Sequence, residues 1–343
     1  MTTSTRIVLA SRPHGAPTAE NFRTETTELR TPSAGEVLLQ TLDLSLDPYM
    51  RGMMSEAESY TSPIELGQTI VGGTVSRVLE SADPAFGKGD LVLGYAGWQT
   101  HSVESAKNLL PISATHILDK GLPRSAALGV LGMPGFTAWS GLENIGKPQA
   151  GETVVVAAAT GPVGSMVGQI AKLRGARPVG IAGGPEKVAH LRELGFDAAI
   201  DHRADDFVDQ LTGATPDGID VYFENVGGKV WDAVLPRLNT YARVPVCGLV
   251  ANYNSTSLPD GPDRSPALLG RILARSLTIR GFIQREFAPT QTAAFLAEIA
   301  PLVADGTISY REDVTDGLDN AVEAFTGLLE GRNFGKVIVR VAD

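Results

Sequence analysis

One turn in the sequence constrains the fold of this chain more than any other feature. A valine-rich run, Val154–Val156, precedes the turn, and apolar residues recur at helical spacing after it: Val163, Met166, Val167, Ile170 and Leu173. The turn carries Ala159-x-Gly161-x-x-Gly164, the dinucleotide-binding pattern with alanine in place of its first glycine. In a strand–turn–helix unit, Gly161 lets the main chain approach a pyrophosphate, Gly164 allows the helix to pack closely on the sheet, and the helix N-terminus faces the anion. We predict cofactor contacts from Ala159, Gly161, Val163 and Gly164; the alternative is an ordinary turn that binds nothing.

The pattern of apolar runs changes near the middle of the chain. Up to about Asp119, short apolar runs alternate with turn signals, as in "EVLLQTLDLSLDP" and "GDLVLGYAGWQTHSV", which indicates an antiparallel β domain. From "GETVVVAAATG" onward, strand-like runs alternate with helical patterns, which predicts parallel βαβ units. A chain of 343 residues is long for one domain, so two domains are expected.

Charge and composition exclude several classes of function. The formal net charge of −10 argues against a general affinity for nucleic acid or anionic membranes, which require a basic excess. No apolar run is long enough for a signal peptide or a membrane span, so we expect a cytoplasmic protein. Cys247 is the single cysteine, which excludes an intramolecular disulfide and a four-cysteine zinc site.

The end of the second predicted strand of the nucleotide unit indicates which cofactor binds. NAD-specific units carry an acid there that binds the ribose 2′-hydroxyl. This chain has Gly183 and Gly184 instead, followed by Lys187, and the third strand ends in His202 and Arg203. An acid would repel a 2′-phosphate, whereas lysine and arginine attract one through charge-assisted hydrogen bonds. We therefore predict NADP(H) as the cofactor, with Gly183, Lys187, His202 and Arg203 at the phosphate; the alternative for Lys187 is a solvated residue in the first turn of a helix.

Six further motifs resemble a known protein family over nearly the whole chain. They are "DPYMR" at Asp47–Arg51, "GMPGFTAW" at Gly132–Trp139, "AAATGPVGSMVGQIAKLRG", "ENVGG" at Glu224–Gly228, "CGLVANYN" at Cys247–Asn254 and "RNFGK" at Arg332–Lys336. In this order they are similar to the medium-chain dehydrogenase/reductase superfamily. Within it they look like the zinc-independent branch of the leukotriene/prostaglandin reductases, plant double-bond reductases and curcumin reductases.

The resemblance implies an α/β fold with two domains. It predicts a GroES-like, β-rich catalytic domain built from residues 1–122 and 301–343, and a doubly wound Rossmann domain over residues 123–300 with a parallel sheet. The active site is expected in the cleft between these domains. Family members commonly dimerise through the edge of the Rossmann sheet, which would place "SLTIRGFI" near the interface of a homodimer.

The resemblance also implies roles for individual residues. Asn225 and Asn333 are expected to contact the cofactor, and main chain near Cys247 and Phe282 is expected to lie against it. This branch often carries tyrosine where the present chain has His202, so the binding of the adenosine phosphate departs from the family pattern there.

A zinc-dependent mechanism is disfavoured. The zinc alcohol dehydrogenases of the superfamily carry Gly-His-Glu in the region of "LGQTIVGG", whereas this chain has Gly67 followed by Gln68 and lacks the ligating cysteines. Without a Lewis acid nothing lowers the pKa of an alcohol toward neutrality. We predict no metal and no alcohol oxidation.

Reduction of an α,β-unsaturated ketone or aldehyde needs no metal. NADPH supplies a hydride to the β-carbon, and a hydroxyl donor can stabilise the negative charge that collects on the carbonyl oxygen. Tyr253 is the first candidate because it follows the "CGLVA" strand in a loop, and the resemblance assigns the matching tyrosine to this oxygen; the alternative is a surface-loop aromatic residue. Tyr49 is the second candidate, as donor or pocket wall, with packing as the alternative. Met133 and Trp98 are predicted to line the substrate pocket, and structural packing explains them equally well.

Two other functions fit the same sequence. Quinone reduction uses the same cofactor and also needs no zinc, and analysis of the products separates it from enone reduction. A catalytically idle NADPH-binding protein is the alternative of another class, since folds of this superfamily also serve structural or regulatory roles. Retention of the glycines, Lys187 and both tyrosines favours an enzyme.

Overall fold

The computed structural model describes residues 2–57, 59, 61–115, 117–257 and 261–343. These residues form two compact units. Unit 1 comprises the chain up to Gly132 together with Arg311–Asp343, and unit 2 comprises Met133–Tyr310. None of the described helices is long and apolar enough to cross a membrane.

The limits of the units differ from the predicted domain boundaries of 122/123 and 300/301. The second predicted boundary falls inside helix α8, which runs without interruption over Ala288–Ala304 in unit 2. Pro301 lies within this helix, exposed in its last turn, where it lacks the N–H group that would bond to the carbonyl of Ala297. Residues 123–132 lie in unit 1 and residues 301–310 lie in unit 2.

Unit 1 is built mainly from an antiparallel sheet, as the alternation of apolar runs and turns predicts. Its seven-stranded sheet has the order β14-β15-β3-β4-β5-β7, with β6 also paired to β3. β1 and β2 form a separate antiparallel hairpin. The elements are β1 (Thr2–Leu9), β2 (Phe22–Leu29), β3 (Glu36–Ser45), α1 (Tyr49–Met53), β4 (Thr74–Ser81), β5 (Leu91–Gly94), β6 (His101–Ser105), β7 (Leu110–Pro111), β14 (Glu312–Asp316), α9 (Ala321–Leu329) and β15 (Lys336–Arg340).

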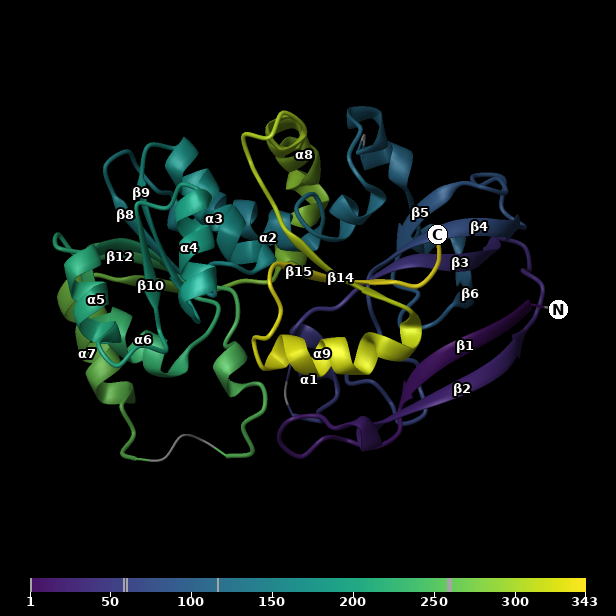
Figure 1. Ribbon diagram of the computed structural model, residues 1–343, viewed down its shortest axis with the longest axis horizontal. Coiled ribbons are helices and arrows are strands. Elements are labelled where there is room, and N and C mark those ends of the chain that lie inside the picture. Colours follow the sequence, from purple (N-terminus) through teal and green to yellow (C-terminus); the bar gives the residue numbers. More distant parts are fainter. Residues whose placement is uncertain (1, 58, 60, 116, 258–260) are drawn as a thin grey trace. The chain divides into compact units, whose positions relative to one another are not determined.

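The last strand of the chain completes this sheet. β15 pairs antiparallel with the end of β3 through Ile338–Ser45, Val339–Leu44 and Arg340–Asp43, and parallel with β14 on its other side. Figure 1 shows these yellow C-terminal strands beside the purple β3 from the N-terminal region. Unit 1 thus consists of both ends of the chain.

Unit 2 is a doubly wound α/β fold. Its six strands are all parallel, in the order β10-β9-β8-β11-β12-β13, which is the Rossmann arrangement. The strand-like runs from "GETVVVAAATG" onward thus form a parallel sheet, of which Figure 1 labels β8, β9, β10 and β12. The elements are α2 (Met133–Gly141), β8 (Thr153–Ala157), α3 (Pro162–Leu173), β9 (Arg177–Ala182), α4 (Pro185–Glu193), β10 (Ala198–Asp201), α5 (Phe207–Ala214), β11 (Ile219–Phe223), α6 (Gly228–Val234), β12 (Leu238–Val246), α7 (Ser265–Arg275), β13 (Thr278–Gly281) and α8.

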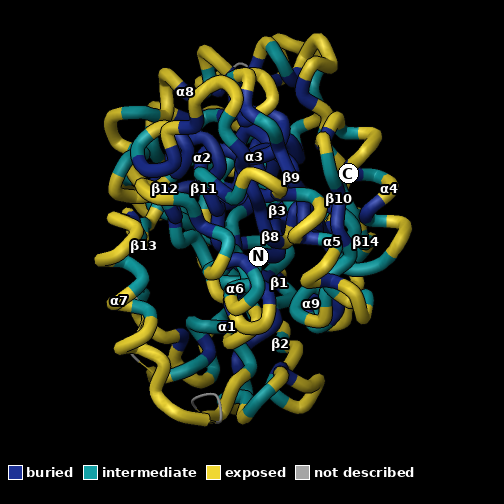
Figure 2. Tube along the Cα trace, turned by 90° about the vertical axis from the view of Figure 1, so that its left-hand side faces the viewer, coloured by how far each residue is buried: buried dark blue, intermediate teal, exposed yellow. Residues whose placement is uncertain are grey.

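Alternate residues of the unit 2 strands bury opposite faces of the sheet. Val179 and Ile181 of β9 join a core that α5 and α6 complete with Leu211 and Val230. Gly180, between them, faces the other side, where a Cβ atom would lie 2.8 Å from the Leu191 side chain of α4. Figure 2 shows the central strands buried and α7 and β13 largely exposed. Both faces of the sheet are therefore covered, which explains the continuous apolar runs of β8 and β9.

Candidate functional site

The turn after β8 has the geometry of a phosphate-binding loop. Gly161 caps α3 in an extended conformation, and Pro162 occupies the first helical position. At Gly164 a Cβ atom would collide with the carbonyl oxygen of Ala158 and lie 2.7 Å from the Cα of Ala159. Only glycine fits there, so the close packing predicted for Gly164 is present.

The start of α3 presents unused donors at this turn. The first N–H groups of a helix lack acceptors within it, and Pro162 has no N–H, so Val163 and Gly164 supply the first two. Ala159 is fully buried, and its own N–H donates to the carbonyl of Ile181 at 2.9 Å. The turn is thereby fixed to β9 while the helix N-terminus, with its partial positive charge, stays open to an anion.

The ends of β9 and β10 lie side by side and form a basic surface. Asp201 joins them, because its Oδ1 accepts hydrogen bonds from the N–H groups of Gly184 at 2.9 Å and Arg203 at 2.8 Å. A Cβ atom on Gly183 would lie 2.8 Å from the Nε of Arg203 and 2.9 Å from the Nε2 of His202. The predicted residues Gly183, His202 and Arg203 are therefore neighbours in the fold.

Two lysines flank this basic surface. Lys187, a predicted residue, is half-buried in the first turn of α4. Lys229, which sequence reasoning missed, lies in the first turn of α6 and donates from Nζ to the carbonyl oxygen of His202 at 2.6 Å. A signal for Lys229 exists in the sequence, since it directly follows "ENVGG" at the start of a helix.

His202 is held in its neutral form. Burial lowers the pKa of its imidazole, and the positive charges of Lys229 and Arg203 lower it further, while Asp201 and the residue's own main chain oppose the change. The Nδ1 atom is buried and makes no hydrogen bond with the described residues. The ring is neutral and lies near two cations, so an added anion would raise its pKa strongly.

Three residues of the motifs meet at the ends of β11 and β12: Glu224, Asn225 and Cys247. Asn225 donates from Nδ2 to the carbonyl oxygen of Ala157 at 2.8 Å, so it joins the ends of β11 and β8. Cys247 donates from its N–H to the carbonyl oxygen of Glu224 at 2.9 Å. Burial raises the pKa of the Cys247 thiol to about 12, and the nearby Glu224 adds to the effect. The thiol is therefore protonated and unreactive at neutral pH, and Cys247 contributes main chain to this edge.

Glu224 is a buried carboxyl group beneath this edge. Its Oε1 accepts hydrogen bonds from the N–H groups of Val226 at 2.6 Å and Gly227 at 2.9 Å, and from the Tyr222 hydroxyl at 3.0 Å. Its Oε2 is buried without a hydrogen bond to the described residues. Burial raises the pKa of Glu224 and outweighs these hydrogen bonds. The carboxyl group fixes the "ENVGG" turn rather than facing a substrate.

Tyr253 lies above the end of β12. It follows the short 3₁₀ helix Val250–Asn252, and its hydroxyl oxygen lies 3.2 Å from the position that a Cβ atom would take on Gly248. The same position is 3.5 Å from the carbonyl oxygen of Asn225. The structure thus brings the predicted donor next to the main chain at Cys247 and Asn225, where the cofactor is predicted to lie.

Two further candidates of unit 2 are half-buried residues at the ends of elements. Phe282 follows β13, donates from its N–H to the carbonyl of Val246 at 3.3 Å and packs edge-on against Phe223, with ring centroids 6.1 Å apart. Met133 is the first residue of α2, where its carbonyl accepts the Thr137 hydroxyl at 2.7 Å. Both remain predictions as cofactor or pocket residues.

The two aromatic candidates of unit 1 differ in how far they are buried. Tyr49 is half-buried as the first residue of α1. Trp98 has no exposed surface, stacks on Phe22 at 5.9 Å between ring centroids and meets Phe325 edge-on at 5.5 Å. This burial favours the packing alternative for Trp98, because the side chain has no surface that a substrate could contact.

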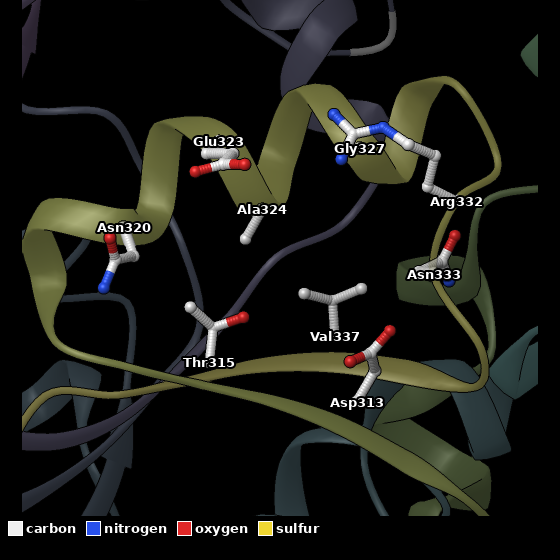
Figure 3. A pocket seen from close by; sticks show the side chains of 9 residues that line it. All are labelled: Asp313, Thr315, Asn320, Glu323, Ala324, Gly327, Arg332, Asn333 and Val337. Carbon is white, nitrogen blue, oxygen red and sulfur yellow. The ribbon is translucent and has the colours of Figure 1, made fainter.

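Asn333 lies at a cavity within unit 1. It donates from Nδ2 to the carbonyl oxygen of Gly335 at 2.9 Å, which fixes the "RNFGK" turn. The cavity has a volume of about 330 Å³, and Figure 3 shows α9 on one side of it and β14 and β15 on the other. Its lining is Asp313, Thr315, Asn320, Glu323, Ala324, Gly327, Arg332, Asn333 and Val337. Asn333 stays a predicted cofactor residue.

Two other motif residues form a buried ion pair that sequence reasoning missed. Lys336 of "RNFGK" lies 3.1 Å from the Oδ1 of Asp47 of "DPYMR", and both are buried. Lys336 also donates to the carbonyl of Leu46 at 2.6 Å, and Ser45 donates its hydroxyl to Asp47. The pair anchors the chain just after β3, at Asp47, two residues before Tyr49. Nothing in the sequence indicates it, because the partners are far apart along the chain.

No group of three or more His, Cys, Asp or Glu among the described residues has a metal-binding arrangement.

Comparisons with known proteins agree with this architecture. Residues 5–112 match the family model "N-terminal domain of oxidoreductase", and residues 162–300 match the model "Zinc-binding dehydrogenase". The chain is 56% identical over 338 residues to the NADPH-dependent curcumin reductase of Escherichia coli (strain K12), covering 98% of this chain and 96% of that protein. It is 42% identical over 330 residues to prostaglandin reductase 1 of Mus musculus, covering 95% of both. The crystal structure of CurA in complex with NADPH from Vibrio vulnificus is 50% identical, with a TM-score of 0.94 and 99% of both chains covered.

Proposed function

The chain belongs to the medium-chain dehydrogenase/reductase superfamily, in the branch of the curcumin and prostaglandin reductases, and from that premise we propose that it is an NADPH-dependent reductase of carbon–carbon double bonds. Its substrates are α,β-unsaturated ketones or aldehydes, and it works without zinc. The family relationship is supported along the whole chain, since a relative named as a curcumin reductase aligns over 98% of it.

The residues of unit 2 fit NADP(H). The turn before α3 leaves no space for a side chain at Gly164, and the open helix N-terminus suits a pyrophosphate. At the end of β9, the absence of a side chain on Gly183 lets His202 and Arg203 lie against it, where both can meet a 2′-phosphate. Asp201, an acid at this place, is engaged by two main-chain N–H groups. Val163, Lys187, Asn225, Cys247, Phe282 and Asn333 complete the proposed set of cofactor contacts.

The observation that carries the proposed reaction is the position of Tyr253 beside the end of β12. NADPH supplies a hydride to the β-carbon of the substrate when it is bound. Tyr253 donates a hydrogen bond to the carbonyl oxygen, where negative charge collects as the enolate forms, and a proton then reaches the α-carbon. A phenol with an ordinary pKa near 10 is a neutral donor at pH 7, as this role requires. Tyr49 and Met133 form part of the proposed pocket for the substrate.

The test is NADPH and NADH oxidation by the purified, chelator-treated protein with a panel of enones, alkenals and quinones, followed by identification of the products. Faster oxidation of NADPH with formation of saturated carbonyl compounds is the expected result. Hydroquinones as the only products would assign the protein to quinone reduction instead. Tight NADPH binding without turnover of any compound would support a non-catalytic protein.

A homodimer is the proposed assembly. β13 is the last strand of the unit 2 sheet, so one of its edges carries main-chain groups that no strand of the sheet uses. The adjoining α7 exposes Leu269 by 64% and Leu273 by 83%, and Figure 2 shows both elements at the surface of unit 2. Analytical ultracentrifugation should give twice the chain mass, and Leu273→Glu should weaken the dimer. Leu173→Glu, at a leucine of α3 that is 50% exposed, is the control that should not. A cytoplasmic location stays a prediction.

A further inference from the structure

We propose that His202 determines the preference for NADPH by taking up a proton when the 2′-phosphate binds, so that affinity for NADPH, unlike that for NADH, rises as the pH falls toward 6. This inference rests on the proposed cofactor and adds a property that neither the motif nor the resemblance supplies.

The position of the ring carries the first step. His202 Nε2 and Arg203 Nε both approach the space that a side chain on Gly183 would fill, at 2.9 and 2.8 Å from a Cβ atom there. His202 Nε2 and Arg203 Nε therefore both lie against Gly183 at the end of β9. A phosphate oxygen bound next to these two side chains would accept a hydrogen bond from each, from Nε2 once the ring is protonated.

The second step concerns the fixed orientation of the ring. Lys229 holds the carbonyl oxygen of His202 at 2.6 Å, and Asp201 holds the N–H of the next residue at 2.8 Å. The main chain on both sides of the imidazole is thus fixed. The ring's other nitrogen, Nδ1, is buried and makes no hydrogen bond with the described residues, so the Nε2 side is the one that can meet a ligand.

The third step is the charge around the ring. Arg203 on the same loop and Lys229 on α6 are cations that disfavour imidazolium, and Asp201 at the end of β10 is an anion that favours it. Lys187 follows the end of β9 in the first turn of α4. Burial and the two named cations keep the pKa of His202 below its usual value in the free protein. The ring is therefore neutral at pH 7.

A phosphate dianion reverses this balance. Its two negative charges offset Arg203, Lys229 and Lys187, and one oxygen accepts a hydrogen bond from Nε2, so the pKa of His202 rises in the complex. Binding then draws a proton from solution at any pH between the free and bound pKa values. Because the ligand binds the protonated ring more tightly, affinity increases as the pH falls through this interval. Protonation of the phosphate itself, near pH 6, limits the gain on the acid side.

The experiment uses two non-reducible probes with the full-length protein. Adenosine 2′,5′-bisphosphate carries the 2′-phosphate, and 5′-AMP lacks it. The ring C–H signals of the five histidines are recorded by NMR at pH 7, and His202 is assigned by the signal lost in His202→Gln. Titration calorimetry in two buffers of different ionisation enthalpy gives the number of protons taken up.

The expected result is a shift of the His202 signal to the imidazolium position with the bisphosphate but not with 5′-AMP. Wild-type protein should take up more protons than His202→Gln, and the variant should bind the bisphosphate about tenfold more weakly at pH 6, with a smaller loss at pH 8. Lys229→Met should raise the pKa of His202 in the free protein and so reduce proton uptake on binding. His190→Gln, at a histidine of α4 that pairs with Glu193, is the matched control and should behave as wild type.

Each contrary outcome has a distinct meaning. If the bisphosphate binds more tightly than 5′-AMP while His202 stays neutral and proton uptake equals that of His202→Gln, the NADP(H) assignment stands and this inference is wrong. If the two probes bind equally, the NADP(H) preference fails, and this inference fails with it.

Discussion

The hydroxyl oxygen of Tyr253 lies 3.2 Å from the point that a Cβ atom on Gly248 would occupy. A contact of this length is tighter than an ordinary contact between a methyl carbon and an oxygen, so Gly248 has room for the hydroxyl only because it lacks a side chain. The glycine of "CGLVANYN" and the tyrosine five residues later in the printed sequence therefore form one structural unit.

Tyr253→Phe should lower kcat for an enone by roughly 10²- to 10³-fold, because loss of one oxyanion donor costs about 2.7–4 kcal/mol in the transition state. The KM for NADPH should change little. Steady-state and single-turnover rates measure the effect. Tyr241→Phe, at an exposed tyrosine of β12, is the control. An unchanged single-turnover rate in Tyr253→Phe would remove this hydroxyl from the reaction.

Gly248→Ala should also slow the reaction, by less than Tyr253→Phe. The added methyl group would displace the hydroxyl by a few tenths of an ångström, and catalytic hydrogen bonds are sensitive to such changes. Combining the two substitutions distinguishes the cause. The double variant should be no slower than Tyr253→Phe alone if the methyl group acts through the hydroxyl, whereas additive losses would indicate a separate effect of Gly248.

Gly183→Asp should shift the cofactor preference from NADPH toward NADH. The carboxylate would repel the 2′-phosphate and occupy the space beside His202 and Arg203, while an acid at this place favours the ribose 2′-hydroxyl. We expect NADPH affinity to fall by about 100-fold or more, which corresponds to about 2.8 kcal/mol. Gly183→Ala adds bulk without charge and is the matched control. Equal losses of NADPH affinity in the two variants would show that the added volume, and not the charge, causes the effect.

Lys187→Ala should raise the KM for NADPH about tenfold and leave that for NADH nearly unchanged, since a charge-assisted hydrogen bond to the phosphate contributes about 1.5–3 kcal/mol. Initial rates with both cofactors measure the change. Lys172→Ala is the control, because Lys172 of α3 pairs with Asp197 at 2.6 Å instead. Parallel increases for NADPH and NADH would contradict a role at the 2′-phosphate.

Lys336→Met and Asp47→Asn should each destabilise the protein by about 3–5 kcal/mol, because either change leaves a buried charge without its partner. The double variant should lose less than the two single losses together, since it contains neither charge. Urea unfolding of unit 1, followed by Trp98 fluorescence, measures the three variants. Fully additive losses would show that the two side chains act independently.

The buried Glu224 should make stability depend on pH. Its pKa is raised in the folded protein, so the folded state retains the proton that the unfolded chain releases near pH 4.3, and stability falls as the pH rises from there through the folded pKa. Glu224→Gln lacks this titration. Its stability relative to wild type should therefore increase between pH 4.5 and pH 7.5, by about 1.4 kcal/mol for each pH unit of pKa difference. A constant difference in urea midpoint across this range would contradict the assignment.

Local patterns predicted most of unit 2. The six strands, the turn at Gly161 and the basic residues at the ends of β9 and β10 follow from short stretches of sequence, because each βαβ unit folds from neighbouring residues. Pro301 illustrates the limit of this reasoning. The predicted domain boundary at 300/301 falls at this proline, yet α8 continues through it, with Phe295 and Ile299 buried on its preceding turns.

Contacts between residues that are far apart along the chain could not be predicted from the sequence. Trp98 stands in a loop-like stretch, and only its packing against Phe22 and Phe325 shows that it belongs to a core. Lys229 directly follows "ENVGG", yet it becomes part of the basic surface only because α6 starts beside the end of β10. Such pairings depend on the tertiary fold and leave no periodic pattern along the chain.

The pairing of β15 with β3 also sets an order of events during synthesis. A ribosome has synthesised every strand of the parallel sheet, the last of which ends at Gly281, before it adds Lys336–Arg340, so this sheet is free to fold while the strand between β14 and β3 does not yet exist. Ile338 and Val339 then enter a sheet whose strands β3 to β7 were made in the first third of translation. A nascent chain that stalls or is cleaved shortly before its end would carry a finished nucleotide-binding unit attached to an N-terminal half with an open sheet edge, which makes that edge the segment most in need of protection by a chaperone.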